Sequence, residues 1–107
     1  MSKITNLVQK VNTIIKNMDT IIDSESIYFG MMTTKLTEVR NDVLIATRMA
    51  PTSTVDMFDN STILLTNLAQ EILDSPEYEE AYDLLVTLLI KLNQFVISIN
   101  MATNAVR

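Results

Sequence analysis

Paired carboxylates are the side chains of this sequence whose spacing could support chemistry. Glu71 and Asp74 lie three residues apart at the end of one expected helix, and Glu80 and Asp83 repeat that spacing at the start of the next. Residues three apart share a face of a helix, so each pair presents two carboxylates together. Two such pairs that meet across a helix hairpin would offer the oxygen ligands that Mg²⁺ prefers.

The carboxylates of residues 71–83 resemble, in part, the metal-binding arrays of all-helical nucleoside-triphosphate pyrophosphatases. This resemblance implies a metal-dependent nucleotide hydrolase. The motifs nevertheless stand in a different order and at a different distance, and the segment contains no Lys or Arg to bind phosphate. We therefore interpret the carboxylates first as helix caps and solubilising groups, because negative charge is favourable at a helix N-terminus, and we predict no metal site.

The missing residue types exclude several other kinds of site. Histidine and cysteine do not occur among the 107 residues, and glycine occurs once. Disulfides, zinc fingers and nucleophile–base pairs built on Cys or His are therefore excluded. One glycine is too few for a loop that cradles nucleotide phosphates. We expect a protein that is not an enzyme and that needs no cofactor.

Charge is unevenly distributed along the chain. Between Met49 and Ile90 there are eight acidic residues and no basic one, whereas the whole chain has a net charge of −5. Nucleic-acid binding is disfavoured, because it needs basic residues to neutralise phosphates. An alternative function is an acidic inhibitor or nucleic-acid mimic that docks on a basic target protein. Its docking face would comprise Glu71, Asp74, Glu77, Glu79, Glu80 and Asp83.

Apolar residues recur at helical spacing in the first half of the chain. In residues 4–22 three positions of each heptad are apolar, which predicts a helix with a wide buried stripe. A second helix is predicted to end at Pro51, because the residue before a proline avoids helical dihedral angles. It is either separate from the first helix or continuous with it through a bend at Gly30. Its stripe is Phe29, Met32, Leu36, Val39, Val43, Ala46 and Ala50.

Two more helices are predicted in the second half. Asn60 lies in a weakly helical stretch, so a kink there and a helix from about residue 61 are expected. Ser75 and Pro76 mark the start of the fourth helix, as a cap and a first helical residue. The apolar set of the third helix is Val55, Met57, Phe58, Leu64, Leu65, Leu68 and Ile72.

The predicted fourth helix carries more apolar surface than one stripe. Its main stripe is Tyr78, Tyr82, Leu85, Leu89, Leu92, Val96, Ile99, Thr103 and Val106. A second set lies outside that stripe and comprises Leu84, Val86, Leu88, Ile90, Phe95, Ile97 and Met101. A helix that is apolar nearly all round is surrounded by other helices or shared with another chain. We predict the second arrangement, a symmetric homodimer, with an interface made by Leu84, Leu88, Leu92, Phe95 and Ile99. Replacing Leu88 by Glu is then expected to dissociate the oligomer with helicity partly retained.

Membrane insertion is not expected, although Leu84–Met101 is long enough to cross a bilayer. Lys91, Asn93, Gln94 and Asn100 would then lie within the bilayer, at a cost of several kcal/mol. The N-terminus has no pattern of a secretory signal. We therefore expect a cytoplasmic protein.

These patterns together predict an all-α fold. Residues 1–107 are expected to form a single domain, a three- or four-helix antiparallel up-down bundle with coiled-coil-like packing and a long C-terminal helix. The expected function is a non-catalytic, self-associating interaction module that serves as an assembly factor, adaptor or structural component. Abundant Ile, Asn, Thr and Met with few Gly, Pro and Ala are typical of small phage and viral proteins, which would place it in the host cytoplasm or the virion.

Overall fold

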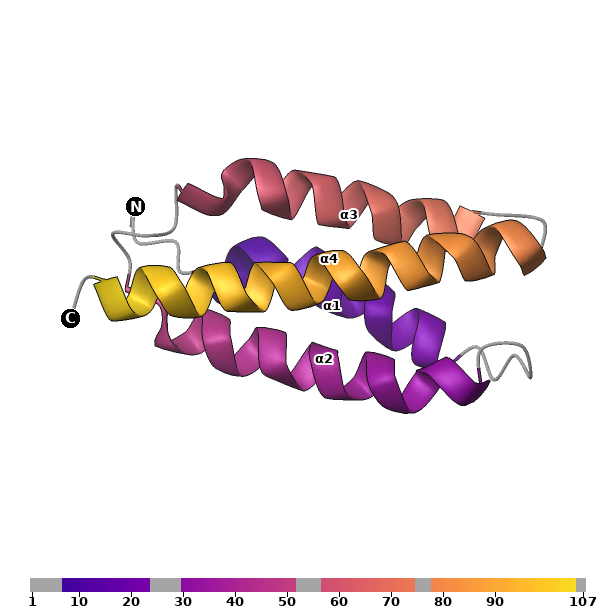
Figure 1. Ribbon diagram of the computed structural model, residues 1–107. Coiled ribbons are helices and arrows are strands. Elements are labelled where there is room, and N and C mark those ends of the chain that lie inside the picture. The colour runs from indigo at the N-terminus through magenta and orange to yellow at the C-terminus, as the bar shows by residue number, and fades with distance from the viewer. Residues whose placement is uncertain (1–6, 24–29, 52–56, 75–77, 106–107) are drawn as a thin grey trace.

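The chain folds as a bundle of four helices. The computed structural model describes residues 7–23, 30–51, 57–74 and 78–105, with the side chains of residues 30–33 and 78–80 left aside (Figure 1). Its helices are α1 (Leu7–Asp23), α2 (Gly30–Met49), α3 (Asp59–Asp74) and α4 (Tyr78–Ala105). Successive helices run in opposite directions (Figure 1). The all-α helical bundle is thereby confirmed, with a long C-terminal helix.

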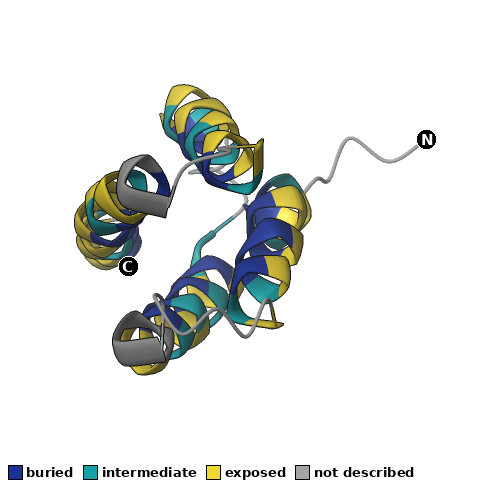
Figure 2. Cartoon of the chain, turned by 90° about the vertical axis from the view of Figure 1, so that its right-hand side faces the viewer, coloured by how far each residue is buried: buried dark blue, intermediate teal, exposed yellow. Residues whose placement is uncertain are grey.

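The four helices form a ring in which consecutive helices are not always neighbours. α1 packs against α2 and α3, and α4 packs against the same two helices. α2 and α3 therefore lie diagonally across the bundle, as the end-on view shows (Figure 2). In a simple up-down bundle each helix lies beside its successor. The segment between α2 and α3 has length enough for a diagonal crossing, since extended chain spans about 3.3 Å per residue.

The heptad pattern of the first helix is confirmed by burial in α1. Its buried apolar residues are Leu7, Val11, Ile14, Ile15, Met18 and Ile21. Val8 and Ile22 are half-buried, and the predicted cap Ser2 and Ile4 lie outside the described residues. Asn17 is buried as well, which the heptad pattern did not predict.

α1 and α2 are separate helices. α1 ends at Asp23 and α2 begins at Gly30, and the two lie side by side in opposite directions (Figure 1). The alternative of one helix bent at Gly30 is therefore wrong, because a bend cannot reverse a helix against itself. In α2 the predicted stripe is confirmed at Leu36, Val39, Val43 and Ala46, which are buried, whereas the side chains of Phe29 and Met32 lie outside the described residues.

Among the described residues, ion pairs join α1 to both of its neighbours. Arg40 of α2 donates from Nε to Oδ1 of Asp19 at 2.5 Å and from Nη2 to Oδ2 at 3.1 Å. These hydrogen bonds to a carboxylate raise the pKa of Arg40 further above its ordinary value. Lys10 of α1 pairs with Asp59 at the start of α3.

The start and the buried face of α3 differ from the expectation. The helix begins at Asp59 instead of residue 61, directly after a short 3₁₀ turn at Met57 and Phe58. Phe58, Leu65 and Ile72 are buried as predicted, but Met57 and Leu64 are exposed. Adjacent helical residues point about 100° apart, and in α3 Leu65 points into the core while Leu64 points to the surface. Val55 lies outside the described residues.

Two buried threonines provide a test of the packing. The Thr103 hydroxyl has no hydrogen-bond partner in the described part of the chain, whereas Thr47, which is also buried, donates to the Leu44 carbonyl at 3.1 Å. Thr103→Val is expected to raise the free energy of unfolding by about 1 kcal/mol, because it removes an unsatisfied buried polar group. The measurement is urea unfolding followed by circular dichroism. Thr47→Val is the control and should give no gain; equal gains at both sites would contradict the assignment.

Candidate functional site

The residues predicted to form an oligomer interface lie inside the single chain. Leu88, Leu92 and Ile99 are fully buried, Phe95 is 4% exposed, and Leu84 is half-buried against the core. Their assignment to an intermolecular surface is therefore corrected. The physical reason is the position of α4: it packs on both α2 and α3, so these side chains face other helices of the same chain.

A different row of apolar residues on α4 remains exposed. Ile90 is 54% exposed, Ile97 58% and Met101 68%, and the half-buried Val86 lies one turn before Ile90. Steps of four, seven and four residues place these side chains on one line along a helix. We call Val86, Ile90, Ile97 and Met101 the α4 stripe. It runs along the outward side of α4, between the edges that meet α2 and α3.

Exposed apolar residues of the two neighbouring helices flank the α4 stripe. On α2, Lys35, Glu38 and Asp42 line a groove against Leu89 and Asn93 of α4. Ile45 and Met49 follow Asp42 by three and seven residues, so they continue the same edge of α2, and both are more than half exposed. On the other side, the exposed Leu64 belongs to the α3 edge of a second groove.

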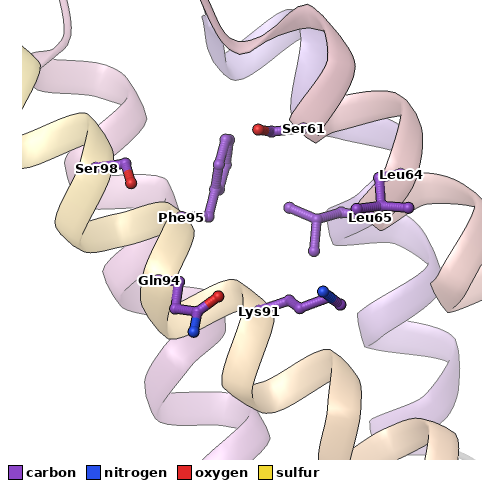
Figure 3. A pocket seen from close by; sticks show the side chains of 7 residues that line it. All are labelled: Ser61, Leu64, Leu65, Lys91, Gln94, Phe95 and Ser98. Carbon is purple, nitrogen blue, oxygen red and sulfur yellow. The ribbon is translucent and has the colours of Figure 1, made fainter.

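The groove between α3 and α4 is partly polar. It is lined by Ser61, Leu64, Leu65, Lys91, Gln94, Phe95 and Ser98 (Figure 3). Phe95 closes its floor and meets Phe58 edge-on, with ring centroids 5.8 Å apart. Two serines and a lysine border it, but no acidic residue does, so the groove itself offers no carboxylate ligand for a metal. The side chains that line this groove can pack against an apolar group and hydrogen-bond with a polar one.

The predicted acidic docking face is only partly described. Glu71, Asp74 and Asp83 are exposed, and Asp74 accepts a hydrogen bond of 3.0 Å from Gln70 one turn earlier in α3. Glu77 and the side chains of Glu79 and Glu80 lie outside the described residues. Among the residues that the structure describes, no three acidic side chains are grouped closely enough to hold a metal ion.

By length and composition, one helix among the described residues could span a membrane: Ala81–Ala105 of α4. A helix that forms the core of a soluble bundle passes the same test. Here the apolar side chains Leu85, Leu88 and Leu92 pack in the bundle core.

The fold and its surface define an all-α bundle whose last helix presents an exposed apolar stripe. Comparison of the chain with protein families, with curated proteins and with solved structures finds no match.

The sequence contained a signal for the α4 stripe. Ile90 and Ile97 stand seven residues apart and outside the main apolar stripe of the fourth helix. Leu88 and Phe95 of the same second set have the same spacing two residues earlier, so only the positions of α2 and α3 show which members point outward.

Proposed function

We propose that this protein is a non-catalytic interaction module that associates with itself through the α4 stripe. The observation that carries the proposal is the alignment of Ile90, Ile97 and Met101, each more than half exposed, along the outward side of α4. Single exposed apolar residues are ordinary on soluble proteins, but a continuous apolar patch marks an interaction surface.

Burial of this surface would supply the driving force for association. Each Å² of apolar surface removed from water contributes about 25 cal/mol. The flanking Ile45, Met49 and Leu64 widen the patch beyond one helix. A surface across three helices can approach the roughly 800 Å² per partner of a standard interface.

The decisive experiment compares two isoleucines of equal exposure. Ile97 on the α4 stripe is 58% exposed, and Ile63 on α3 is 59% exposed but borders the groove beside Lys10 of α1. Ile97→Glu is expected to halve the mass measured by light scattering at micromolar concentration, because it introduces a desolvated charge into the interface. Ile63→Glu should leave the mass of the oligomer unchanged.

Circular dichroism checks that both variants keep the helicity of the unmodified protein. A strictly monomeric unmodified chain would remove the proposed function. An Ile97→Glu variant that stays oligomeric would place the interface elsewhere.

The alternative function, an inhibitor that docks its acidic face on a basic protein, stays a prediction. It is supported by the exposed carboxylates of Glu71, Asp74 and Asp83 and by the lack of basic residues between Met49 and Ile90. Mutations can distinguish between the two functions. Asp74→Lys combined with Asp83→Lys would weaken a salt-sensitive complex with a basic partner, whereas Ile97→Glu would leave that complex intact and remove self-association through the α4 stripe.

A further inference from the structure

We propose that the self-associated form is an antiparallel dimer in which α4 packs on α4 of a second copy, about a two-fold axis between Asn93 and Gln94. This inference rests on the proposed function and adds the geometry of the interface. Three observations carry it: the spacing of the α4 stripe, the residues at its centre and the distribution of charge along the bundle.

The spacing of the α4 stripe reads the same in both directions. Val86 precedes Ile90 by four residues, Ile90 precedes Ile97 by seven, and Met101 follows Ile97 by four. A two-fold axis perpendicular to the helix and midway along this stripe places Ile90 against Ile97 of the second copy. The same axis places Val86 against Met101. An isologous interface needs such a self-complementary surface. In the antiparallel register, each residue of the α4 stripe lies opposite another apolar residue of the stripe on the second copy.

The centre of the α4 stripe is uncharged and able to pair with itself. Asn93 and Gln94 are exposed on either side of the stripe, at its midpoint. Each carboxamide carries both donors and an acceptor, so each can hydrogen-bond with its own copy across the axis. A polar residue of this kind within an apolar helix interface selects one register.

Charge selects the antiparallel orientation over the parallel one. The exposed Glu71, Asp74 and Asp83 lie at the end of the bundle where α3 meets the start of α4. The described part of α4 after Asp83 contains no acidic residue, and the exposed Arg48 lies in the last turn of α2, beside the last turns of α4. A parallel dimer would bring two acidic ends together, whereas the antiparallel dimer places each acidic end near the basic end of its partner.

Distances between spin labels test this arrangement directly, because the chain has no native cysteine. Asp83 and Asn104 are exposed and lie symmetrically about the proposed axis. With Asn104→Cys labelled on both copies, the antiparallel dimer gives a separation of about 30 Å along the helix, from 1.5 Å of rise per residue. A parallel dimer brings the same labels to within about 10 Å of backbone separation, the spacing of packed helices.

A mixed dimer provides the reciprocal measurement. One copy carries Asp83→Cys with a nitroxide and the other carries Asn104→Cys with a gadolinium label. The antiparallel dimer places these two positions side by side, and the parallel dimer separates them by about 30 Å. Circular dichroism of the labelled variants serves as the control that they are folded.

Long Asn104–Asn104 and short Asp83–Asn104 distances support the proposal. The reverse pattern, or distances that match neither register, overturns the antiparallel arrangement while self-association stands. A monomer by light scattering overturns the proposed function itself, so the two failures are distinguishable.

Discussion

Replacing Leu88 by glutamate is expected to unfold the protein. The Leu88 side chain is fully buried in the core of the bundle. The change removes a large apolar side chain, at about 2–5 kcal/mol, and adds a carboxylate with no partner, which costs more again. The total approaches the whole stability of a domain of this size, about 5–15 kcal/mol. Far-UV circular dichroism should show a loss of most of the helical signal.

The matched control lies two residues further along the same helix. Ile90 is exposed on the α4 stripe, so Ile90→Glu should keep its helicity and its cooperative unfolding while losing self-association. Comparison of the two variants distinguishes a buried position of α4 from an exposed one. If Leu88→Glu gave a well-folded helical monomer, Leu88 would belong to an intermolecular surface, as the sequence pattern had predicted.

Phe95→Ala is expected to have the second largest effect, a loss of about 3–5 kcal/mol in the free energy of unfolding. Phe95 is buried, and its ring meets Phe58 at an interplanar angle of 88°. This edge-to-face geometry adds about 0.5–1.5 kcal/mol beyond the burial of area. The contact ties α4 to the residue just before α3. Urea unfolding monitored by circular dichroism gives the change.

A double-mutant cycle isolates the contact between the two rings. Phe95→Ala and Phe58→Ala should each destabilise the protein, and the double variant should lose about 0.5–1.5 kcal/mol less than the sum of the two. Should Phe95→Ala fail to fold, Phe95→Leu replaces it in the cycle, because leucine keeps most of the buried area. Full additivity would contradict a direct ring contact.

The positions of the helices were largely predictable from the sequence. α1 follows its heptad pattern from Leu7 to Ile21, and α2 ends at Met49, just before Pro51. α4 is described from Tyr78 onward, whereas its predicted cap Ser75 and first residue Pro76 lie outside the described residues. These signals are local: a capping residue, a proline or a period of 3.6 acts within a few residues of its own position. The all-α bundle follows from them, because each amphipathic helix must bury its apolar stripe against another.

The candidate site was only partly predictable. The excess of apolar surface on the fourth helix was evident from its second apolar set, but the predicted interface residues Leu88, Leu92, Phe95 and Ile99 proved to be core. Periodicity gives a buried direction only when one side of a helix is polar. Between Leu84 and Leu92 nearly every side is apolar, so the pattern leaves the inward direction undetermined.

The sequence by itself determined the approximate extents of most helices, which stripe of α1 is buried, and that α4 is too apolar for a single buried stripe. Tertiary structure decided that α4 packs between α2 and α3, that Leu88 and Phe95 therefore point inward, and that Ile90, Ile97 and Met101 point outward. It also placed α2 and α3 on a diagonal. The physical reason is that helix formation depends on neighbours in the chain, whereas the burial of one face of an all-round apolar helix depends on residues distant in sequence.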